Sequence, residues 1–540
     1  DGTSLTFRRL EKDYRFDLAN RELAELKEED ENNGSDASTQ PASRPWERAG
    51  VGRGQQRGRE KSPDGLWNAI AREWNVVLES ADESETINVT TTGSRKFRYG
   101  KASWVYGEEL DQTEAMWWSP DSTKLAFYEF DERLVKDFPL LKGWNELRPE
   151  EVVEGYPKPG EPNPIASLLI FDVNTRKTIR VDTGGDLDQY VYNVRFTPAG
   201  DELLFNPTNR HQNVLEALAA NVATGESRVV LREEQPTWQN NAPEMRFLKD
   251  GQRFIWETEK NGFKQYELRN LDGSLITALT HGERPVNGIE LVDEDAGVLY
   301  YTKFSDPNPL NIQLHRVRLD GTNDTQLTAN GFTHSVEVSP DGVWFISRME
   351  TIDTPPVTKL FDSYGQTVAT LAESDTTKLQ EFQLQKPELF TFLADDGVTK
   401  LFGTLHKPSD FDPAKKYPLV IDVYGGPFTQ AIRNRWSPAR PECEFGWIVA
   451  EIDNRGTINR GKTFETATYL GLGGVDLRDQ VQAVRELVER PYIDAGRVGI
   501  HGHSYGGFMS ALAILKYPDV FQVAVGSSAV SRAEVRSRLA

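Results

Sequence analysis

Cysteine is almost absent from this sequence, because Cys443 is the only one among 540 residues. A single thiol cannot form an internal disulfide or supply a cysteine-based zinc site. Long apolar runs are also missing: no stretch of about 18 apolar residues occurs, so no transmembrane helix is expected. The chain opens on Asp1 with nothing that resembles a signal peptide. A removed leader and a fragment are both compatible with that start.

Positive charge is in short supply. The chain has 62 Lys and Arg against 83 Asp and Glu, and its formal net charge is −21. An acidic surface repels phosphates, so nucleic acid is not expected as a partner. Nothing in the sequence indicates a metal or an organic cofactor, and none is expected. The length exceeds what one hydrophobic core accommodates, which predicts at least two domains.

Aliphatic residues are scarce near the N-terminus, from about Glu28 to Lys61. Glu, Asn, Ser, Gly, Arg and Pro dominate this segment, and it cannot bury enough apolar surface to offset the entropy lost on ordering. We therefore predict a disordered insertion at about residues 28–60, inside an N-terminal segment of residues 1–60.

Turn signals of one kind recur up to about residue 385. They lie at residues 62–65, 119–121, 197–200, 249–251, 295–297 and 339–342. Each precedes a short alternating or aromatic-rich segment that suits a strand. The pattern predicts a β-propeller over residues 61–385 with blades of about four strands. An array of β-sandwiches is the alternative that the pattern leaves open.

The pattern changes after about residue 388. Residues 417–424 and 447–452 are near-continuous apolar runs, typical of strands covered on both faces. Leu477, Val481, Val484 and Val488 fall on one face of a helix. Strands then alternate with helices, which predicts a parallel α/β sheet over residues 386–540.

Residues 502–506 read Gly-His-Ser-Tyr-Gly, between a predicted strand at residues 497–501 and a predicted helix at residues 508–515. Gly-x-Ser-x-Gly in this context is the nucleophile elbow of an α/β-hydrolase. Glycines allow the tight turn, and the helix N-terminus favours a developing oxyanion. A helix-capping role for Ser504 is the alternative.

A serine nucleophile needs a general base, and in this fold the chain order is Ser, then Asp or Glu, then His. All seven histidines precede Ser504. Residues 505–540 contain one Asp, Asp519, and no His. We therefore expect the catalytic Asp and His to lie beyond the end of this chain, and the 540 residues to be inactive toward peptides.

Several motifs together resemble a known family. The elbow, Asp-Val-Tyr-Gly-Gly-Pro at residues 422–427 and Asp-Asn-Arg-Gly at residues 453–456 resemble the prolyl oligopeptidase family of serine peptidases. Residues 102–109, 117–121 and 156–164 narrow the resemblance to its dipeptidyl peptidase IV branch, in a bacterial-type version. The resemblance implies a mixed fold: an N-terminal β-propeller of about eight blades, followed by a C-terminally incomplete α/β-hydrolase domain.

The resemblance also implies residue roles. Ser504 matches the family's nucleophile. The hydroxyl of Tyr424 and the backbone N–H of Tyr505 match its oxyanion hole. Glu108 and Glu109 match a glutamate pair that holds the α-ammonium group of the substrate, where two carboxylates give strong charge-assisted hydrogen bonds.

The family accepts Pro, or sometimes Ala, before the cleaved bond, in a small aromatic-lined pocket. Tyr505 and Val530 match two of its positions. The similarity stops after Ser531, and residues 533–536 lack the Trp and Tyr residues of relatives, so the pocket is expected to be incomplete.

The implied function is that of a serine exopeptidase releasing N-terminal Xaa-Pro or Xaa-Ala dipeptides. A prolyl tripeptidyl peptidase shares the glutamate pair and stays open, whereas an acylaminoacyl-peptidase is disfavoured because a blocked amino terminus has no charge to pair. A non-catalytic, peptide-binding propeller (a pseudoenzyme) is the third alternative. The expected partners are peptides with a free N-terminus and Pro or Ala at the second position. The resemblance leaves a homodimer of the full-length form open and implies a periplasmic or secreted protein.

Overall fold

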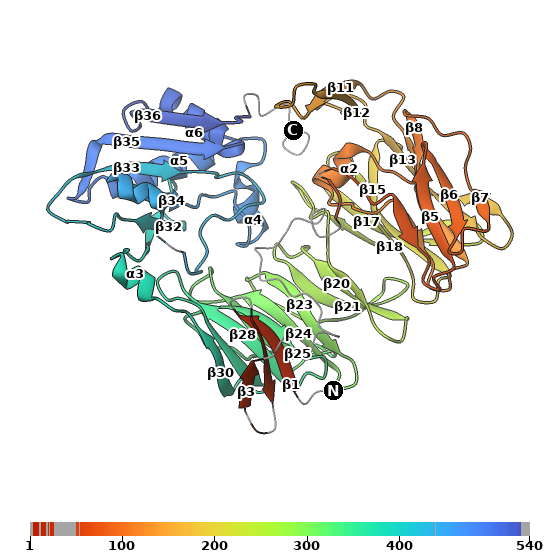
Figure 1. Ribbon diagram of the computed structural model, residues 1–540, viewed down its shortest axis with the longest axis horizontal. Helices are drawn as coiled ribbons and strands as arrows, with labels where there is room; N and C mark the ends of the chain where they lie inside the picture. Colours follow the sequence, from red (N-terminus) through yellow and green to blue (C-terminus); the bar gives the residue numbers. More distant parts are fainter. Residues whose placement is uncertain are drawn as a thin grey trace.

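The computed structural model describes residues 4–9, 12–17, 20, 22–25, 50–52, 54–437 and 439–530. The described chain is dominated by β-strands and falls into two parts (Figure 1). A series of antiparallel sheets forms the first part, and one mixed sheet with helices forms the second. No helix in these ranges is both long and apolar enough to cross a bilayer.

Five antiparallel sheets each consist of four strands that follow one another in the chain. Their strands are β4 (Arg59–Lys61), β5 (Trp67–Arg72), β6 (Asn75–Ser80) and β7 (Thr86–Asn88); β15 (Gln189–Phe196), β16 (Glu202–Asn209), β17 (Val214–Asn221) and β18 (Ser227–Glu234); β19 (Met245–Phe247), β20 (Arg253–Thr258), β21 (Gln265–Asn270) and β22 (Leu275–Ala278); β23 (Val286–Asp293), β24 (Val298–Phe304), β25 (Ile312–Arg318) and β26 (Thr325–Gln326); and β27 (Thr333–Val338), β28 (Trp344–Glu350), β29 (Val357–Asp362) and β30 (Thr367–Glu373).

The remaining sheets of this part are less regular. A five-stranded sheet has the order β14 (Lys177–Arg180), β13 (Ile165–Asp172), β10 (Lys124–Asp131) and β8 (Phe97–Tyr99), with β9 (Met116–Trp118) also paired to β10. Strands β11 (Asp137–Lys142) and β12 (Glu150–Gly155) form a separate hairpin, and β1 (Ser4–Arg9), β2 (Lys12–Asp17) and β3 (Glu22–Glu25) form a three-stranded sheet.

The Ser-Pro-Asp turn signals have a shared structure. In all three the serine Oγ donates a hydrogen bond to the aspartate two residues later, and the backbone N–H five residues after the serine donates to that Oγ. The three serines are Ser62, Ser119 and Ser339. Each turn leads directly into an inner strand of its sheet, β5, β10 or β28, so the same local chemistry recurs in three of the sheets.

Figure 1 shows these sheets following one another along an arc from β5–β7 to β28–β30. The predicted propeller is confirmed, and the array of sandwiches is excluded. The described residues form seven such sheets if the three-stranded β1–β3 is included. Phe16 of β2 packs in one cluster with Leu360 and Leu371, which places β1–β3 beside the last blade. The number eight stays a prediction of the resemblance.

The second part has one six-stranded sheet of order β31 (Glu388–Leu393), β32 (Lys400–His406), β34 (Ile448–Ile452), β33 (Tyr417–Asp422), β35 (Ile493–His503) and β36 (Val523–Ser527). Pairs β33–β34, β33–β35 and β35–β36 are parallel, as predicted, and β31 and β32 add an antiparallel edge. The predicted strand at residues 497–501 and helix at residues 508–515 are both longer than expected.

Helices α5 (Val475–Leu487) and α6 (Tyr505–Lys516) pack on this sheet in one hydrophobic core. The shorter helical elements of the described chain are α2 (Trp104–Glu109), α3 (Thr377–Glu381), η2 (Pro441–Phe445), α4 (Lys462–Glu465) and η3 (Thr466–Thr468). Leu477, Val481 and Val484 are at most 2% exposed, so the apolar face predicted for α5 is the face that packs.

The change from antiparallel to mixed sheet falls between the end of β30 at Glu373 and the start of β31 at Glu388. The boundaries at about residues 60 and 385 stay predictions. The two parts are in direct contact, because Lys462 Nζ lies 2.8 Å from Glu259 Oε2 and the Trp436 N–H donates to Glu350 Oε2 at 3.1 Å.

The predicted disordered insertion falls partly outside the described residues, which omit 26–49. Its end is wrong, because residues 54–60 are packed. Gly54 forms a β-bridge with Gly107, and Gln56 is 4% exposed. The Gln56 side-chain oxygen accepts a hydrogen bond from the Ala102 N–H at 3.1 Å, and the Gln56 backbone carbonyl accepts one from Lys101 Nζ at 2.8 Å. These tertiary hydrogen bonds order a segment that has little apolar surface of its own.

Candidate active site

Ser504 lies in the sharp turn between β35 and α6, as the elbow motif predicts. Its φ of 59° and ψ of −115° are strained values for a residue with a side chain. A Cβ on Gly502 would lie 2.2 Å from the Val423 carbonyl oxygen, and one on Gly506 would lie 2.0 Å from the same atom. Only glycine fits at these two positions, so the motif's glycines let β33, the elbow and α6 approach closely.

The backbone around Ser504 is held by the strand beside it. The Ser504 N–H donates to the Ser527 carbonyl at 2.9 Å, and the Val530 N–H donates to the Ser504 carbonyl at 3.4 Å. This hydrogen bond places Val530, which the resemblance assigns to the pocket, next to the elbow, and Val530 is half-buried.

No described histidine is hydrogen-bonded to the Ser504 hydroxyl. His503 is exposed, with Nδ1 3.1 Å from Ser527 Oγ, and His501 Nδ1 lies 3.9 Å from Asp422. His406 is buried, which lowers its pKa to about 4. Asp519 lies near Arg485 at 3.9 Å. The described chain therefore places no Asp–His pair at the elbow.

Tyr424 and Tyr505, the predicted oxyanion-hole residues, are neighbours. Tyr424 follows β33 and is half-buried, and its ring centroid lies 6.1 Å from that of Tyr505. A Cβ on Gly426 would lie 2.8 Å from the Tyr424 ring and 2.9 Å from the Tyr505 ring, so glycine is needed for this contact. Tyr505 is the first residue of α6, so its N–H has no partner one turn earlier in the helix and can serve an anion.

The Tyr505 side chain is turned inward, away from solvent. It is 1% exposed, and its hydroxyl donates to Asp476 Oδ2 at 2.5 Å. Burial and the nearby Asp476 carboxylate raise the pKa of Tyr505. The phenol is held inward by a buried carboxylate, and the pocket role that the resemblance assigns to Tyr505 stays a prediction.

Two residues of the Asp-Asn-Arg-Gly motif hold the loop that carries Tyr424. Asn454 Nδ2 donates to the Gly425 carbonyl at 3.0 Å. Asp453 Oδ1 accepts the N–H groups of Ala431 and Ile432 at 3.0 and 3.2 Å. Sequence reasoning used these residues only to recognise the family. Their positioning role could be found only once the loop was seen in contact with them.

Asp453 predicts a pH dependence of stability. Asp453 is 5% exposed, and burial raises its pKa to about 7 from an ordinary value near 4. The folded state then holds this proton more tightly than the unfolded state, so this group's contribution is greatest below about pH 4 and falls as the pH rises through about 7. Asp453→Asn removes the titration while its amide oxygen can still accept both N–H groups.

We expect the melting temperature of Asp453→Asn to rise relative to wild type between about pH 4 and pH 7, by an amount equivalent to a few kcal/mol. Differential scanning fluorimetry over this range measures it. Asp519→Asn, which changes a carboxyl that is 71% exposed, is the control and should follow wild type. A constant difference between Asp453→Asn and wild type would contradict the assignment.

Glu108 and Glu109 lie at the C-terminal end of helix α2, and both are half-buried. The helix is fixed to the propeller by Tyr106, which is 1% exposed and whose hydroxyl accepts the Val191 N–H at 2.9 Å. Figure 1 shows α2 on the inner side of the arc, on the side nearest α4 and α6. The glutamate pair and Ser504 therefore belong to different parts of the chain.

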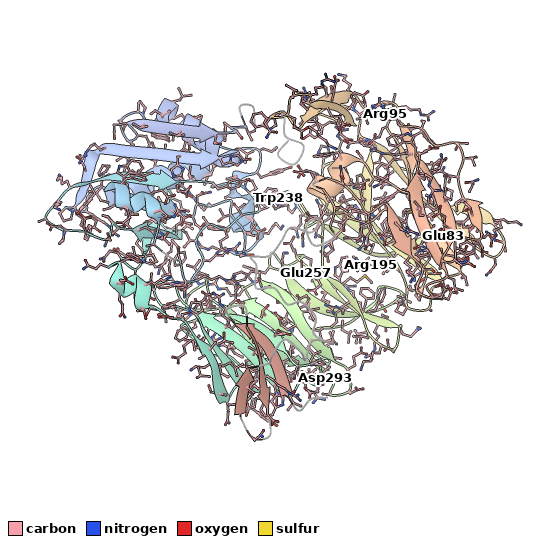
Figure 2. All side chains as sticks on the ribbon, viewed as in Figure 1. Glu83, Arg95, Arg195, Trp238, Glu257 and Asp293 are labelled. Carbon is pink, nitrogen blue, oxygen red and sulfur yellow. The ribbon has the colours of Figure 1, made fainter. Side chains whose placement is uncertain are left out.

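An aromatic junction that sequence reasoning missed joins the two parts beside the Tyr424 loop. The Trp238 ring of the propeller lies 5.8 Å from the Phe428 ring and 5.8 Å from the Tyr469 ring. Figure 2 shows Trp238 in the middle of the molecule, between the two parts. Phe428 is four residues after Tyr424, so this contact ties the Tyr424 loop to the propeller.

Comparison with known proteins agrees with this architecture. Residues 28–356 match the family described as "Dipeptidyl peptidase IV (DPP IV) N-terminal region". The chain belongs to this family. Residues 437–535 match the prolyl oligopeptidase family. The predicted placement in the dipeptidyl peptidase IV branch of the prolyl oligopeptidase family is confirmed.

Individual relatives are similar over most of this chain. "Probable dipeptidyl-aminopeptidase B" of Emericella nidulans is 27% identical over 478 residues, which cover 82% of this chain and 52% of the relative. "Probable dipeptidyl peptidase 4" of Arthroderma benhamiae is 27% identical over 492 residues, covering 86% and 62%. The chain thus spans about half to three fifths of the length of these two relatives.

Among solved structures, dipeptidyl peptidase 4 of Porphyromonas gingivalis matches with a TM-score of 0.80 and 26% identity. The match covers 100% of this chain and 75% of that one. The chain therefore has a propeller followed by an α/β-hydrolase domain, and it is related to the serine peptidases of this family.

Proposed function

We propose that this chain provides the propeller, the nucleophile and the oxyanion hole of a serine exopeptidase that releases Xaa-Pro or Xaa-Ala dipeptides from free N-termini. One observation carries the proposal: a strained elbow serine beside Tyr424 and Tyr505, in a chain of the dipeptidyl peptidase IV family that has a glutamate pair on helix α2.

In the proposed reaction, Ser504 Oγ attacks the carbonyl carbon of the second residue and gives its proton to a general base. The Tyr424 hydroxyl and the Tyr505 N–H stabilise the oxyanion that forms. The protonated base then transfers this proton to the leaving amine, and a dipeptidyl ester of Ser504 remains. Water attacks this ester, its proton goes to the same base, and the dipeptide leaves as Ser504 is regenerated.

Glu108 and Glu109 define the exopeptidase in this proposal. Two carboxylates that bind one α-ammonium group would anchor the amino terminus at a fixed distance from Ser504. We propose that this distance admits two residues before the cleaved bond. A prolyl tripeptidyl peptidase would use the same pair and remains the alternative within the family, and a peptide-binding pseudoenzyme is the alternative outside catalysis.

We further propose that the general base comes from residues other than the described ones, because none of the described histidines lies at Ser504. The 540 residues by themselves are then expected to release no dipeptide. An extended form, in which residues supplying the catalytic Asp and His follow Ala540, is expected to be active. The natural partners proposed are peptides with a free N-terminus, the proposed location is periplasmic or secreted, and a homodimer of the extended form is proposed.

The test compares the 540-residue chain with the extended form on Gly-Pro-p-nitroanilide and on a matched Xaa-Xaa-Pro tripeptide anilide. Release of p-nitroaniline from the dipeptide substrate by the extended form alone supports the proposal. Preference for the tripeptide substrate would favour the tripeptidyl alternative. An extended form that binds peptides but hydrolyses neither substrate would establish the pseudoenzyme.

A further inference from the structure

Three polar side chains on one face of helix α5 are completely buried. Asp476, Asp479 and Gln480 are each 0% exposed, and their spacing of i, i+3 and i+4 places them on the same face. Burying a polar group costs free energy unless it is hydrogen-bonded. The partners of these three side chains therefore show what this face of α5 holds in place.

Asp479 holds the backbone beside the Tyr424 loop. Its carboxylate accepts Arg455 Nε at 2.9 Å and Nη2 at 2.7 Å, together with the Arg455 and Asp395 N–H groups, each at 3.0 Å. All of its partners lie in the segments that follow β34 and β31. The role of Asp479 is structural.

Gln480 reaches the Tyr424 loop through one intermediate. Gln480 Nε2 donates to Asn454 Oδ1 at 3.0 Å and to the Ile452 carbonyl at 2.8 Å. Asn454, itself 0% exposed, donates to the Gly425 carbonyl. Because its side-chain oxygen is taken by Gln480, the Asn454 amide is oriented with its N–H₂ group toward Gly425, the residue next to Tyr424.

Asp476 reaches the other half of the oxyanion hole. Its Oδ2 accepts the Tyr505 hydroxyl at 2.5 Å and the Gly473 N–H at 3.0 Å. Its Oδ1 is buried and has no hydrogen-bond partner within the described residues. One oxygen of the carboxyl group is thus hydrogen-bonded to Tyr505, while the other is buried without a partner among the described residues. Burial raises the pKa of Asp476.

We propose that Asp476 is a positioning residue for the oxyanion hole, acting through the phenol of Tyr505. This inference rests on the proposed peptidase function. The Tyr505 hydroxyl is hydrogen-bonded to Asp476, and the Tyr505 ring centroid lies 5.4 Å from that of Phe508. Because the side chain is fixed at both places, the direction of the Tyr505 backbone N–H is fixed as well. The same helix face holds Gly425 through Gln480 and Asn454, and α5 therefore sets the distance between the two oxyanion donors.

Correct spacing matters because a donor displaced by about 1 Å from the developing oxyanion can cost about 100-fold in rate. Such a displacement weakens transition-state binding and leaves ground-state binding at the glutamate pair intact. The signature of a positioning residue here is a lower kcat at an unchanged KM.

The experiment measures kcat and KM of the extended form carrying Asp476→Asn, Tyr505→Phe or both. We expect each single variant to lower kcat about 10- to 100-fold with KM within about threefold. The double variant should be no slower than the slower single variant, because both changes act on one hydrogen bond: Tyr505→Phe removes its donor, and Asp476→Asn replaces its carboxylate acceptor with a neutral amide. Tyr505→Phe keeps the ring, so it tests the proposal even if Asp476→Asn folds poorly.

Tyr266→Phe is the matched control. The Tyr266 hydroxyl donates to Glu244 Oε2 at 2.8 Å, and this side chain is 0% exposed in the propeller. The Tyr266→Phe substitution removes the same kind of buried hydrogen bond between a phenol and a carboxylate, but in the propeller. It should therefore lower the melting temperature and leave kcat unchanged. Tyr505→Phe or Asp476→Asn behaving like this control would overturn the proposal.

A second readout needs no catalysis and uses the 540-residue chain. Amide hydrogen exchange followed by mass spectrometry should show at least tenfold faster exchange in the peptides covering residues 424–426 and 505–507 in Asp476→Asn, but not in Tyr266→Phe. Unchanged exchange at both places would also overturn the proposal. Failure of the proposed function is distinct, because it would appear as an extended wild-type form that hydrolyses neither substrate, or as full activity of a Ser504→Ala variant.

Discussion

Ser504→Ala is expected to reduce kcat for dipeptide release by the extended form about 10⁴- to 10⁶-fold. The physical reason is that no other group is held at the elbow to form the ester. Ser504 has a φ of 59° in a sharp strand-to-helix turn flanked by two glycines, the geometry of a nucleophile elbow. The residual rate would come from the oxyanion donors and substrate binding alone.

The measurement is release of p-nitroaniline from Gly-Pro-p-nitroanilide, with the melting temperature recorded to verify folding. Ser510→Ala is the matched control. Ser510 lies on the same helix, and its hydroxyl donates to the Gly506 carbonyl at 2.8 Å, so it takes no part in the proposed chemistry. This control should keep its kcat. Turnover by Ser504→Ala at more than a few per cent of wild type would remove Ser504 from the nucleophile role.

The second large effect is expected at the glutamate pair. Glu108→Gln and Glu109→Gln should each lower kcat/KM about 10- to 100-fold for a substrate with a free α-amino group, because a charge-assisted hydrogen bond contributes about 1.5–3 kcal/mol. Gln keeps the size of the side chain and removes the charge. The helix itself should be unaffected, since Tyr106 anchors it through a separate bond to Val191.

A desamino analogue of the same dipeptide anilide separates ammonium capture from a general defect. It has no charge to bind, so wild type should hydrolyse it slowly and the two Gln variants should be no slower. Glu114→Gln is a control for loss of an acidic side chain near α2, because Glu114 is paired with Arg57. Equal losses on both substrates would argue against ammonium binding by Glu108 and Glu109.

The propeller was predictable because its signal is local and repeated. Ser62, Ser119 and Ser339 start their turns with the same side-chain hydrogen bonds, all within five residues of chain. The parallel sheet was predictable from apolar runs such as residues 417–424. The order of its strands was not, because sheet order depends on pairing between segments far apart in the sequence.

Buried polar residues were the main omission. Asp476 and Gln480 lie between the apolar positions of α5, where a periodicity argument treats polar residues as solvent-facing. Both are fully buried because the elbow and the segment around Asn454 pack on that side of the helix and supply hydrogen bonds. Residues 54–60 were misread for a related reason, since hydrogen bonds from α2 and its flanking residues order them without apolar burial.

From the sequence alone came the family, the two-part architecture and the elbow serine, because each depends on short motifs whose geometry is decided by neighbouring residues. The tertiary structure decided that the Tyr505 phenol turns inward, that Asp476 of helix α5 accepts its hydrogen bond, and that Tyr106 fixes α2 to the propeller. These features depend on which polar groups meet once distant segments pack, and burial then makes every unpaired hydrogen-bonding group costly.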